Sequence, residues 1–121
     1  MQGKIKSFTD LVAWQEAHKL VILIYRITDK FPNKEIYGLT NQIRRAAVSI
    51  TSNIAEGFLR QGKKEKIQFY YLAKSSLTEV QNQLLIARDV DYLDKSLFNS
   101  IAQQTVRVSK LIFGLIKFQK S

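Results

Sequence analysis

The chain has 121 residues, 45% of them apolar and 24% charged, which fits one folded domain and excludes a disordered tail. It contains no cysteine, and this excludes a disulfide framework, a thiolate metal site and a thiol nucleophile. Nineteen basic residues against ten acidic ones give a net charge of +9, which favours a polyanionic partner such as nucleic acid or an anionic membrane surface. A basic surface that is only hydrated and binds no partner would give the same net charge.

No stretch of the sequence is apolar enough to span a membrane. The longest apolar run covers residues 20–25, whereas a membrane span needs about 20 such residues. The N-terminal sequence MQGKIKSFTD also lacks the apolar core of a secretory signal peptide. We therefore expect a cytoplasmic protein.

Apolar residues recur every three or four positions along four segments, which is the spacing of amphipathic helices. The first predicted helix ends at residues 31–33, because Pro32 disfavours helical backbone before it and cannot donate a hydrogen bond to the preceding turn. The second runs from about residue 35 to 59, with Gly57 and Gly62 as its stop signals.

The third predicted helix runs from about residue 64 to 90, and the fourth starts after Asp94, a predicted N-cap, and continues to the end of the chain. In the first two helices the expected core positions are Trp14, Ala17, Val21, Ile24, Thr28 and Phe31, then Leu39, Ile43, Ala47, Ile50, Ile54 and Phe58. In the last two they are Tyr70, Ala73, Leu77, Val80, Leu84 and Ala87, then Leu97, Ile101, Gln104, Val108, Leu111, Leu115 and Phe118.

Four long helices with short connections predict a single all-α domain over residues 1–121, an up-down-up-down antiparallel four-helix bundle. The first and fourth helices carry more apolar residues than one core-facing stripe needs. The additional residues are Leu20, Ile22, Leu23 and Ile27 in the first helix and Phe98, Val106, Ile112, Phe113 and Ile116 in the fourth. Because such helices must be covered on more than one side, we expect a homo-oligomer. A thick core with a few exposed apolar residues is the alternative.

The sequence offers no catalytic constellation. His18 is the only histidine, and its neighbour Glu16 does not have the Glu-x-x-His spacing of a di-metal bundle. The only acidic pair with the three-residue spacing of a Glu-x-x-Glu metal site is Asp91 with Asp94, where helix capping is the simpler explanation. We therefore expect no enzyme activity, no catalytic residue, no metal site and no cofactor, with a metal-dependent phosphohydrolase as a distant alternative.

One polar stripe runs along the second helix. On a helical wheel Arg45, Ser49, Ser52 and Glu56 lie opposite the predicted core, and Arg44 points to the flank. Three interpretations compete for the stripe: a solvated face, a subunit interface in which Arg45 and Glu56 pair, or a phosphate contact made by Arg45. We favour the interface, because the carboxylate of Glu56 would repel a phosphate backbone.

A basic cluster follows at the turn between the second and third helices. It consists of Arg60, Lys63, Lys64 and Lys66. Lysines at a helix N-terminus oppose the helix dipole, and their presence there is mildly informative because the same end offers free N–H groups to a phosphate. We predict that these four residues and Arg44 contact nucleic-acid phosphates, although a solvating turn would look the same.

Three stretches carry a resemblance to a known family. They are FTDLVAWQEAHKLVILIYRIT, FPNKEIYGLTNQIRRAAVSITSNIAEGFLR and EKIQFYYLAKSSLTEVQNQLLIARDVDYL, which together cover most of residues 8–93. They resemble the bacterial four-helix-bundle family that includes the protein encoded in intervening sequences of 23S ribosomal RNA genes. The accessory variability protein of diversity-generating retroelements is a related branch. The motif residues matched are Gln42, Arg44, Arg45, Ala46, Ala47, Ser49, Ile50, Asn53, Ile54, Ala55, Glu56 and Gly57.

The resemblance implies a small antiparallel bundle that assembles as a ring, a homopentamer, without a cofactor. It also links one branch of the family to a reverse transcriptase and to nucleic acid. Thr51 stands where many relatives carry proline, so the helix kink that a proline would cause is in doubt here.

The sequence therefore predicts a non-enzymatic, homo-oligomeric interaction protein whose basic surface binds RNA or DNA weakly and without sequence readout. The alternative is a protein-binding scaffold, or an accessory subunit for a partner such as a reverse transcriptase, in which the charge only steers association.

Overall fold

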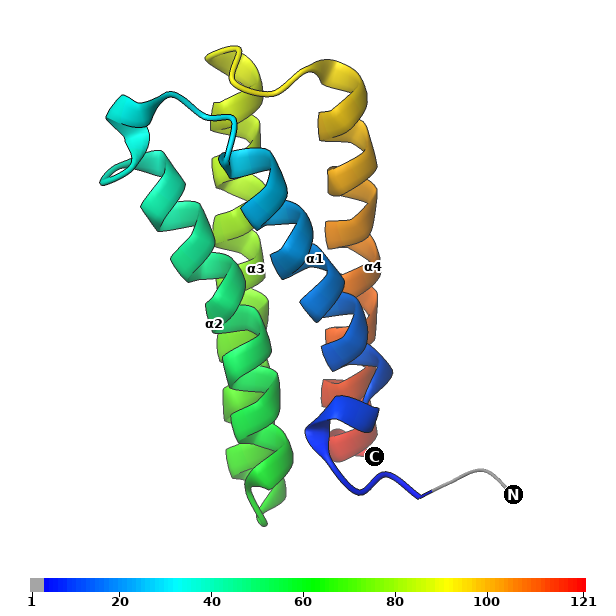
Figure 1. Ribbon diagram of the computed structural model, residues 1–121. Helices are drawn as coiled ribbons and strands as arrows, with labels where there is room; N and C mark the ends of the chain where they lie inside the picture. Colours follow the sequence, from blue (N-terminus) through cyan, green and yellow to red (C-terminus); the bar gives the residue numbers. More distant parts are fainter. Residues whose placement is uncertain (1–3) are drawn as a thin grey trace.

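The computed structural model describes residues 4–121 and is built from four α-helices packed as a bundle (Figure 1). They are α1 (Val12–Thr28), α2 (Leu39–Leu59), α3 (Lys63–Asp89) and α4 (Lys95–Lys120). The short 3-10 turn η1 (Phe8–Asp10) precedes α1, and η2 (Asn33–Glu35) lies between α1 and α2. The all-α fold class and the four-helix bundle predicted from the sequence are thereby confirmed. Within residues 4–121, no helix is both long enough and apolar enough to cross a bilayer.

The helix ends follow local capping chemistry. The Asp94 side chain accepts a hydrogen bond from the Leu97 N–H at 2.8 Å, which confirms Asp94 as the N-cap of α4. The start of α2 was predicted four residues too early. Residues 33–35 form the turn η2, and the Glu35 carboxylate accepts the Leu39 N–H at 3.0 Å, so that α2 begins at Leu39.

The predicted end of the second helix at about residue 59 is confirmed, because α2 ends at Leu59, but Gly57 lies inside the helix and is not a stop signal. The glycine is buried because the ring of Tyr70 on α3 lies against its backbone, where an added Cβ would be 2.5 Å from Tyr70 Cε1. Gly57 therefore serves the close approach of two helices. At Thr51, where relatives were expected to carry proline, α2 is continuous and the hydroxyl donates to the Val48 carbonyl at 3.0 Å.

The predicted core positions of α3 are all buried, and the central ones of α1 and α2 are too. In α4 the prediction was partly wrong, because Leu97 is 40% and Phe118 73% exposed. The buried stripe of α4 is instead Phe98, Ile101, Thr105, Val108, Ile112 and Ile116. Most of the additional apolar residues of α1 and α4 therefore lie in the core, whereas Ile22, Val106 and Phe113 remain exposed.

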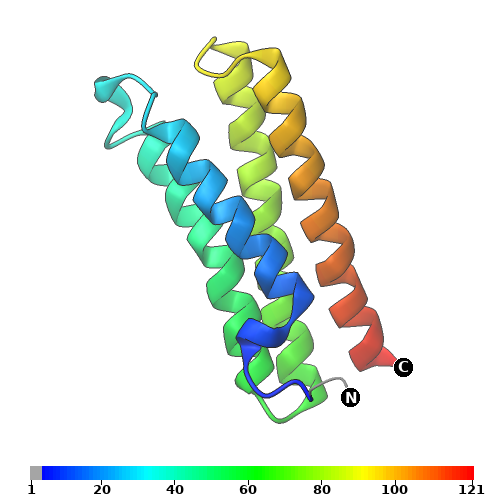
Figure 2. The ribbon, with the colours of Figure 1, turned by 45° about the vertical axis from the view of Figure 1, so that its right-hand side comes forward.

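The bundle has two chemically different ends. Both ribbon views place the α2–α3 turn, the end of α4 and the N-terminal segment at one end, and the α1–α2 and α3–α4 connections at the other (Figures 1 and 2). The first end carries Arg60, Lys63, Lys64, Lys66, Lys117 and Lys120 and is named the basic end below. The basic end also holds the carboxylates of Glu56 and Glu65, which its cations outnumber. At the opposite end the acidic residues Asp29, Asp89, Asp91 and Asp94 lie in or beside the connections, together with the basic residues Lys30, Lys34, Arg88 and Lys95.

Candidate nucleic-acid interface

Lys63 and Lys64 form the accessible part of the predicted basic cluster. Both are exposed on the first turn of α3, and neither makes an ion pair or side-chain hydrogen bond with any other residue of the described range. The N-cap of α3 is Gly62, which supplies no side chain to the first turn. The two ammonium groups are therefore free to meet a phosphate.

Arg60 and Lys66 are partly engaged inside the protein. Arg60 pairs with Glu56 at 2.9 Å, and its guanidinium lies 4.8 Å from the ring centre of Phe69. Lys66 Nζ donates to the carbonyls of Gly57 at 3.2 Å and Phe58 at 2.7 Å, where it satisfies the C-terminal end of α2. Arg60 keeps donors available to a ligand, whereas the role of Lys66 in this structure is to cap a helix.

Lys117 and Lys120 join the cluster, and sequence reasoning missed them. They lie in the last turn of α4, which ends alongside α3 near Tyr71, at the same end of the bundle as the α2–α3 turn. Lys120 Nζ donates to the Tyr71 hydroxyl at 2.9 Å, and this contact holds the pKa of Tyr71 below its ordinary value. An antiparallel bundle must bring the end of the fourth helix to the end of the second, and that topology was the signal that could have identified these lysines.

Exposed aromatic side chains accompany these lysines. Phe118 is 73% exposed, and Tyr71 is 44% exposed beneath the Lys120 ammonium, which is 5.4 Å from the ring centre. Cations beside accessible rings suit nucleic acid, because phosphates meet the cations and unpaired bases stack on the rings.

Arg44 lies far along α2 from the basic end and contacts α1 instead. Its Nε donates to Thr28 Oγ1 at 2.8 Å, and its Nη2 donates to Asp29 Oδ1 at 3.0 Å. The guanidinium also lies 4.6 Å from the ring centre of Tyr25. These contacts hold the start of α2 against the end of α1, so the structure does not bring Arg44 together with the other predicted phosphate contacts.

The polar stripe of α2 is divided between solvent and α3. Arg45, Ser52 and Glu56 are exposed, as predicted, but Ser49 is half-buried with its Oγ 2.8 Å from Ser76 Oγ of α3. Glu56 pairs with Arg60 within the protomer. The element that contacts the stripe at Ser49 is therefore α3 of the same chain, and a subunit contact at Arg45, Ser52 and Glu56 stays a prediction.

A buried carboxylate, which the sequence analysis considered only beside His18, joins α1 to α4. Glu16 accepts hydrogen bonds from Lys19 and Arg107, both at 2.9 Å, and from the Gln104 amide at 3.1 Å. The hydrogen bond from Lys19, followed by that from Gln104, lowers the pKa of Glu16 from 4.5 to about 2. Each donor stabilises the ionised form, so Glu16 stays an anion and acts as a structural tie.

His18, the only histidine of the sequence, lies on the first helix of the bundle. Its ring is stacked on that of Trp14, with 4.7 Å between the ring centres, on the exposed side of α1. Across residues 4–121, no three histidine, cysteine or acidic side chains are grouped so that they could hold a metal ion. His18 therefore lies at the surface, packed against an aromatic ring.

Comparisons with known proteins place these features in a family. The model of the 23S rRNA-intervening sequence protein family matches residues 9–114. A solved structure with a similar fold is that of a protein of unknown function from the S23 ribosomal protein family of Bacteroides thetaiotaomicron. It is 21% identical, covers 88% of this chain and 96% of its own, and superimposes with a TM-score of 0.81. No curated protein sequence matches the chain.

Proposed function

The chain belongs to the 23S rRNA-intervening sequence protein family, and from this membership and the charge of one end of its bundle we propose that it is a non-enzymatic protein that binds RNA or DNA. The single observation that carries the proposal is the gathering of Lys63, Lys64, Lys117 and Lys120 at the basic end, beside exposed aromatic rings. The contacts are to phosphates, so binding is weak and independent of sequence.

Two features of the charge distribution support this proposal. Lys63 and Lys64 form no ion pair within the described chain, so both ammonium groups remain available to a phosphate. The acidic residues of the connections lie at the opposite end, where they do not repel a strand bound at the basic end. An excess of positive charge at one end also speeds the encounter with a polyanion.

The proposal includes assembly as a ring-shaped homo-oligomer. Its proposed size is a homopentamer, because the family resemblance implies one. Apolar side chains that stay exposed on α1, α3 and α4 support it, among them Ile22, Leu85, Val106 and Phe113. In a ring of parallel protomers all basic ends point to the same side. Several weak phosphate sites would then act together on one strand.

The proposal is tested by fluorescence anisotropy with a labelled 20-nucleotide RNA and a DNA of the same sequence, titrated over a range of salt. We expect affinity to fall steeply with salt, and the double variant Lys63→Gln/Lys64→Gln to reduce the log–log slope by about 0.7–0.9 for each lost phosphate contact. The matched control is Lys34→Gln/Lys95→Gln, which removes the same charge from exposed positions at the opposite end and leaves the slope nearly unchanged.

Absence of binding at low salt, or an equal effect of the two double variants, would contradict the proposal. A preference between the RNA and the DNA identifies which nucleic acid is bound, because only RNA carries the 2′-hydroxyl.

A protein-binding scaffold is the second candidate function, and one observation favours it. Tyr37 is 93% exposed and Ile36 54% exposed in the α1–α2 connection, at the end opposite the basic end. Exposed aromatic side chains are common anchors of protein interfaces. A partner such as a reverse transcriptase that binds after nuclease treatment, and is lost in Tyr37→Ser, would favour this function over nucleic-acid binding.

A further inference from the structure

A groove lies between α1 and α4, where hydrogen bonds from Gln104 and Arg107 to Glu16 join the two helices. Its volume is about 330 Å³, and its lining is His18, Lys19, Ile22, Leu23, Arg26 and Gln104. This set, named the α1–α4 groove below, combines apolar side chains with two cations and an aromatic ring. Ligand sites commonly join an apolar surface to a few polar groups, and this volume lies at the lower end of their usual range, so the groove suits a small planar group.

One side of the groove is formed by a stack of two aromatic rings. The centre of the His18 ring lies 4.7 Å from that of Trp14, with 14° between the two planes. Trp14 precedes His18 by one helical turn and Ile22 follows it by one turn, so Trp14 covers one face of the imidazole and leaves the other toward the groove. Phe8 packs edge-on against Trp14, with 5.4 Å between the ring centres. The stack is therefore held in place before any ligand binds, which lowers the cost of binding.

The surface formed by α1 and α4 carries cations with hardly any exposed carboxylate. Helix α4 contains no acidic residue, and its cations are Lys95, Arg107, Lys110, Lys117 and Lys120. The one acidic residue of α1 is Glu16, which is 7% exposed and already accepts hydrogen bonds from Lys19 and Arg107. Arg26, Lys110 and Lys117 take part in no ion pair within residues 4–121. A phosphate backbone laid along these two helices therefore meets cations and no competing carboxylate.

We propose that the α1–α4 groove binds one unpaired base of a nucleic-acid strand, with the neighbouring phosphates on Lys19 and Arg26. The base stacks on the free face of His18 and covers the side chains of Ile22 and Leu23. Such stacking is independent of sequence, because every base has a π face. The inference rests on the proposed function and adds that the strand is single-stranded, because a base inside a duplex is not free to enter the groove.

Gln104 supplies the polar contact for that base. Its Nε2 donates to the Glu16 backbone carbonyl at 2.9 Å and to the Glu16 carboxylate at 3.1 Å. Because both partners are acceptors, the amide keeps this orientation, and Oε1 is the atom left for a ligand. Every base has an N–H group that can donate to it, so this contact orients the base without selecting one.

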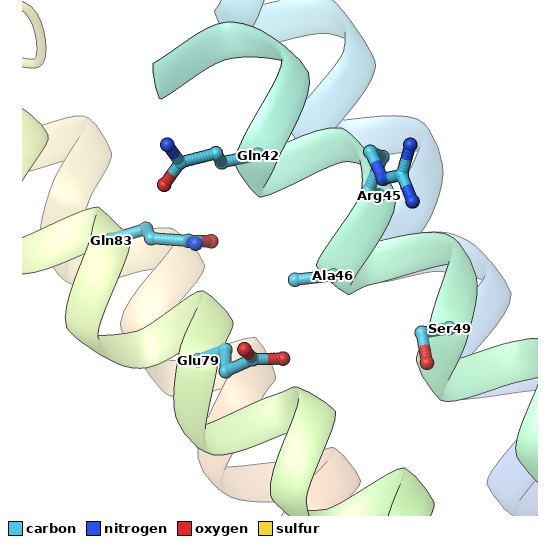
Figure 3. Close-up of a pocket in the computed structure, with 6 residues that line it drawn as sticks. All are labelled: Gln42, Arg45, Ala46, Ser49, Glu79 and Gln83. Atoms are coloured by element: carbon cyan, nitrogen blue, oxygen red, sulfur yellow. The ribbon is translucent and has the colours of Figure 1, made fainter. Parts of the chain in front are cut away.

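The polar groove between α2 and α3 is a poorer place for a base. Its lining is Gln42, Arg45, Ala46, Ser49, Glu79 and Gln83 (Figure 3). The Glu79 carboxylate projects toward α2, whereas the Arg45 guanidinium lies over α2 and points away from Glu79 (Figure 3). That carboxylate would repel the phosphates beside a bound base, and the lining of the α1–α4 groove contains no acidic residue.

One strand can reach both the α1–α4 groove and the basic end. The Arg107–Glu16 hydrogen bond of 2.9 Å places Arg107 of α4 close to His18, which follows Glu16 by two residues. Lys117 at the basic end follows Arg107 by 10 residues of helix, which is about 15 Å at 1.5 Å per residue. A strand of 12 nucleotides extends about 40 Å at the 3.4 Å spacing of a duplex strand, and therefore spans this distance.

The base contact is tested through His18, whose ring signals are unambiguous because the chain has one histidine. The ligands are a 12-nucleotide oligodeoxyadenosine and an abasic strand of the same length, which has the same phosphates and no bases. We expect oligodeoxyadenosine to move the His18 ring C–H signals upfield in ¹³C–¹H spectra at low salt, because a base stacked face to face shields them. The abasic strand should bind through its charge and cause no upfield shift.

The matched variants are Ile22→Asp and Val48→Asp. The two residues are similarly accessible, at 37% and 39%, but Ile22 lines the α1–α4 groove and Val48 lies on α2. We expect Ile22→Asp to abolish the upfield shift and to weaken the binding of oligodeoxyadenosine on the order of tenfold, as the loss of one stacked base does. Val48→Asp should retain both, and thermal melts check that the two variants fold.

Arg26→Gln separates the phosphate contact from the base contact, because it leaves the apolar lining of the groove intact. We expect it to reduce the log–log salt slope for the same strand by about 0.7, as one lost contact to a single strand does, and to keep the upfield shift at saturation. An unchanged slope would overturn the assignment of a phosphate to Arg26.

The inference and the proposed function fail in different ways. If oligodeoxyadenosine binds without moving the His18 signals, or the abasic strand moves them equally, no base occupies the groove, and phosphate binding still stands. If neither strand binds at low salt, the proposed function fails and the inference fails with it. Phosphatidylserine vesicles test the other polyanion: if they perturb the His18 signals and the strand does not, this surface binds a membrane and the inference is overturned.

Discussion

At the scale of single residues, charged side chains of the same type have different roles in this molecule. Arg44 is held by Thr28 and Asp29, and Lys66 caps α2, so their cations stabilise the fold. Lys63 and Lys64 make no such contacts with other described residues and project from the first turn of α3. Local sequence does not distinguish these roles, because each depends on what a distant segment places beside the cation.

Glu16 gives a prediction at this scale. Its carboxylate is 9% exposed, but Lys19 and Arg107 are 66% and 62% exposed, so water screens both pairs. We expect Glu16→Gln to lower the free energy of unfolding at pH 7 by about 1 kcal/mol, since the amide keeps the packing but loses the charge-assisted hydrogen bonds. Urea denaturation measures this loss, and Glu65→Gln serves as the control.

The pH dependence of that loss follows from the pKa. Folding lowers the pKa of Glu16 from 4.5 to about 2, so the carboxylate stabilises the fold fully above about pH 4.5 and progressively less as the pH falls toward 2. The difference between wild type and Glu16→Gln should therefore shrink over this range. An equal difference at pH 7 and pH 2 would contradict the assigned role.

At the scale of elements, periodicity and capping predicted most of the helix structure. Asp94 marked the start of α4 because a cap acts within one turn of its own position. Pro32 placed the end of the first helix at residues 31–33, but α1 already ends at Thr28, and Pro32 precedes the turn η2. The start of α2 depends on Glu35, which caps Leu39 and also accepts the Tyr92 hydroxyl at 2.7 Å. Tyr92 lies 57 positions further along the chain, so no local pattern could reveal that contact.

The core stripe of α4 shows a second limit of sequence reasoning. The predicted and observed stripes share Ile101 and Val108 and differ in which neighbours accompany them. Both obey the helical spacing, so periodicity cannot rank them. Tertiary contacts decide between them, because Gln104 donates to Glu16 at the edge of the α1–α4 contact and Thr105 points inward instead.

The contact between α2 and α3 gives a prediction at this scale. A Cβ at Gly57 would be 2.5 Å from Cε1 of the buried Tyr70 ring, so Gly57→Ala forces two packed helices apart. Overpacking of about 1–3 kcal/mol exceeds the gain of about 1 kcal/mol in helix propensity, and we expect a net loss of about 1 kcal/mol. Thermal and urea denaturation measure it.

Gly114 is the matched control, because a Cβ there would meet no atom within 4 Å and the residue is exposed in α4. Gly114→Ala should therefore stabilise the protein by about 0.5–1 kcal/mol. The two identical substitutions thus have opposite expected signs. A stabilising Gly57→Ala would show that the helices tolerate a wider separation than the packing implies.

At the scale of the whole molecule, the bundle combines a basic end with apolar side chains that one protomer leaves uncovered. Leu85 and Val106 are 41% and 48% exposed and line the same apolar groove between α3 and α4. Weak phosphate contacts from one protomer bind a strand poorly, whereas several basic ends on one side of an assembly bind it together. Assembly and nucleic-acid affinity should therefore change together.

The last prediction concerns this coupling. Val106→Asp places a charge in the groove between α3 and α4, and we expect it to dissociate the proposed homo-oligomer into protomers of 14.0 kDa. Light scattering measures the mass. Val12→Asp is the control, because Val12 is similarly accessible at 52% but lies at the start of α1, away from this groove.

The same variant also tests the coupling to nucleic acid. We expect the affinity of Val106→Asp for the 20-nucleotide RNA to fall on the order of 100-fold with the lost multivalency, although no basic residue has changed. If Val106→Asp keeps the wild-type mass, this face is not the subunit contact; if the mass falls but RNA affinity does not, the basic ends act singly.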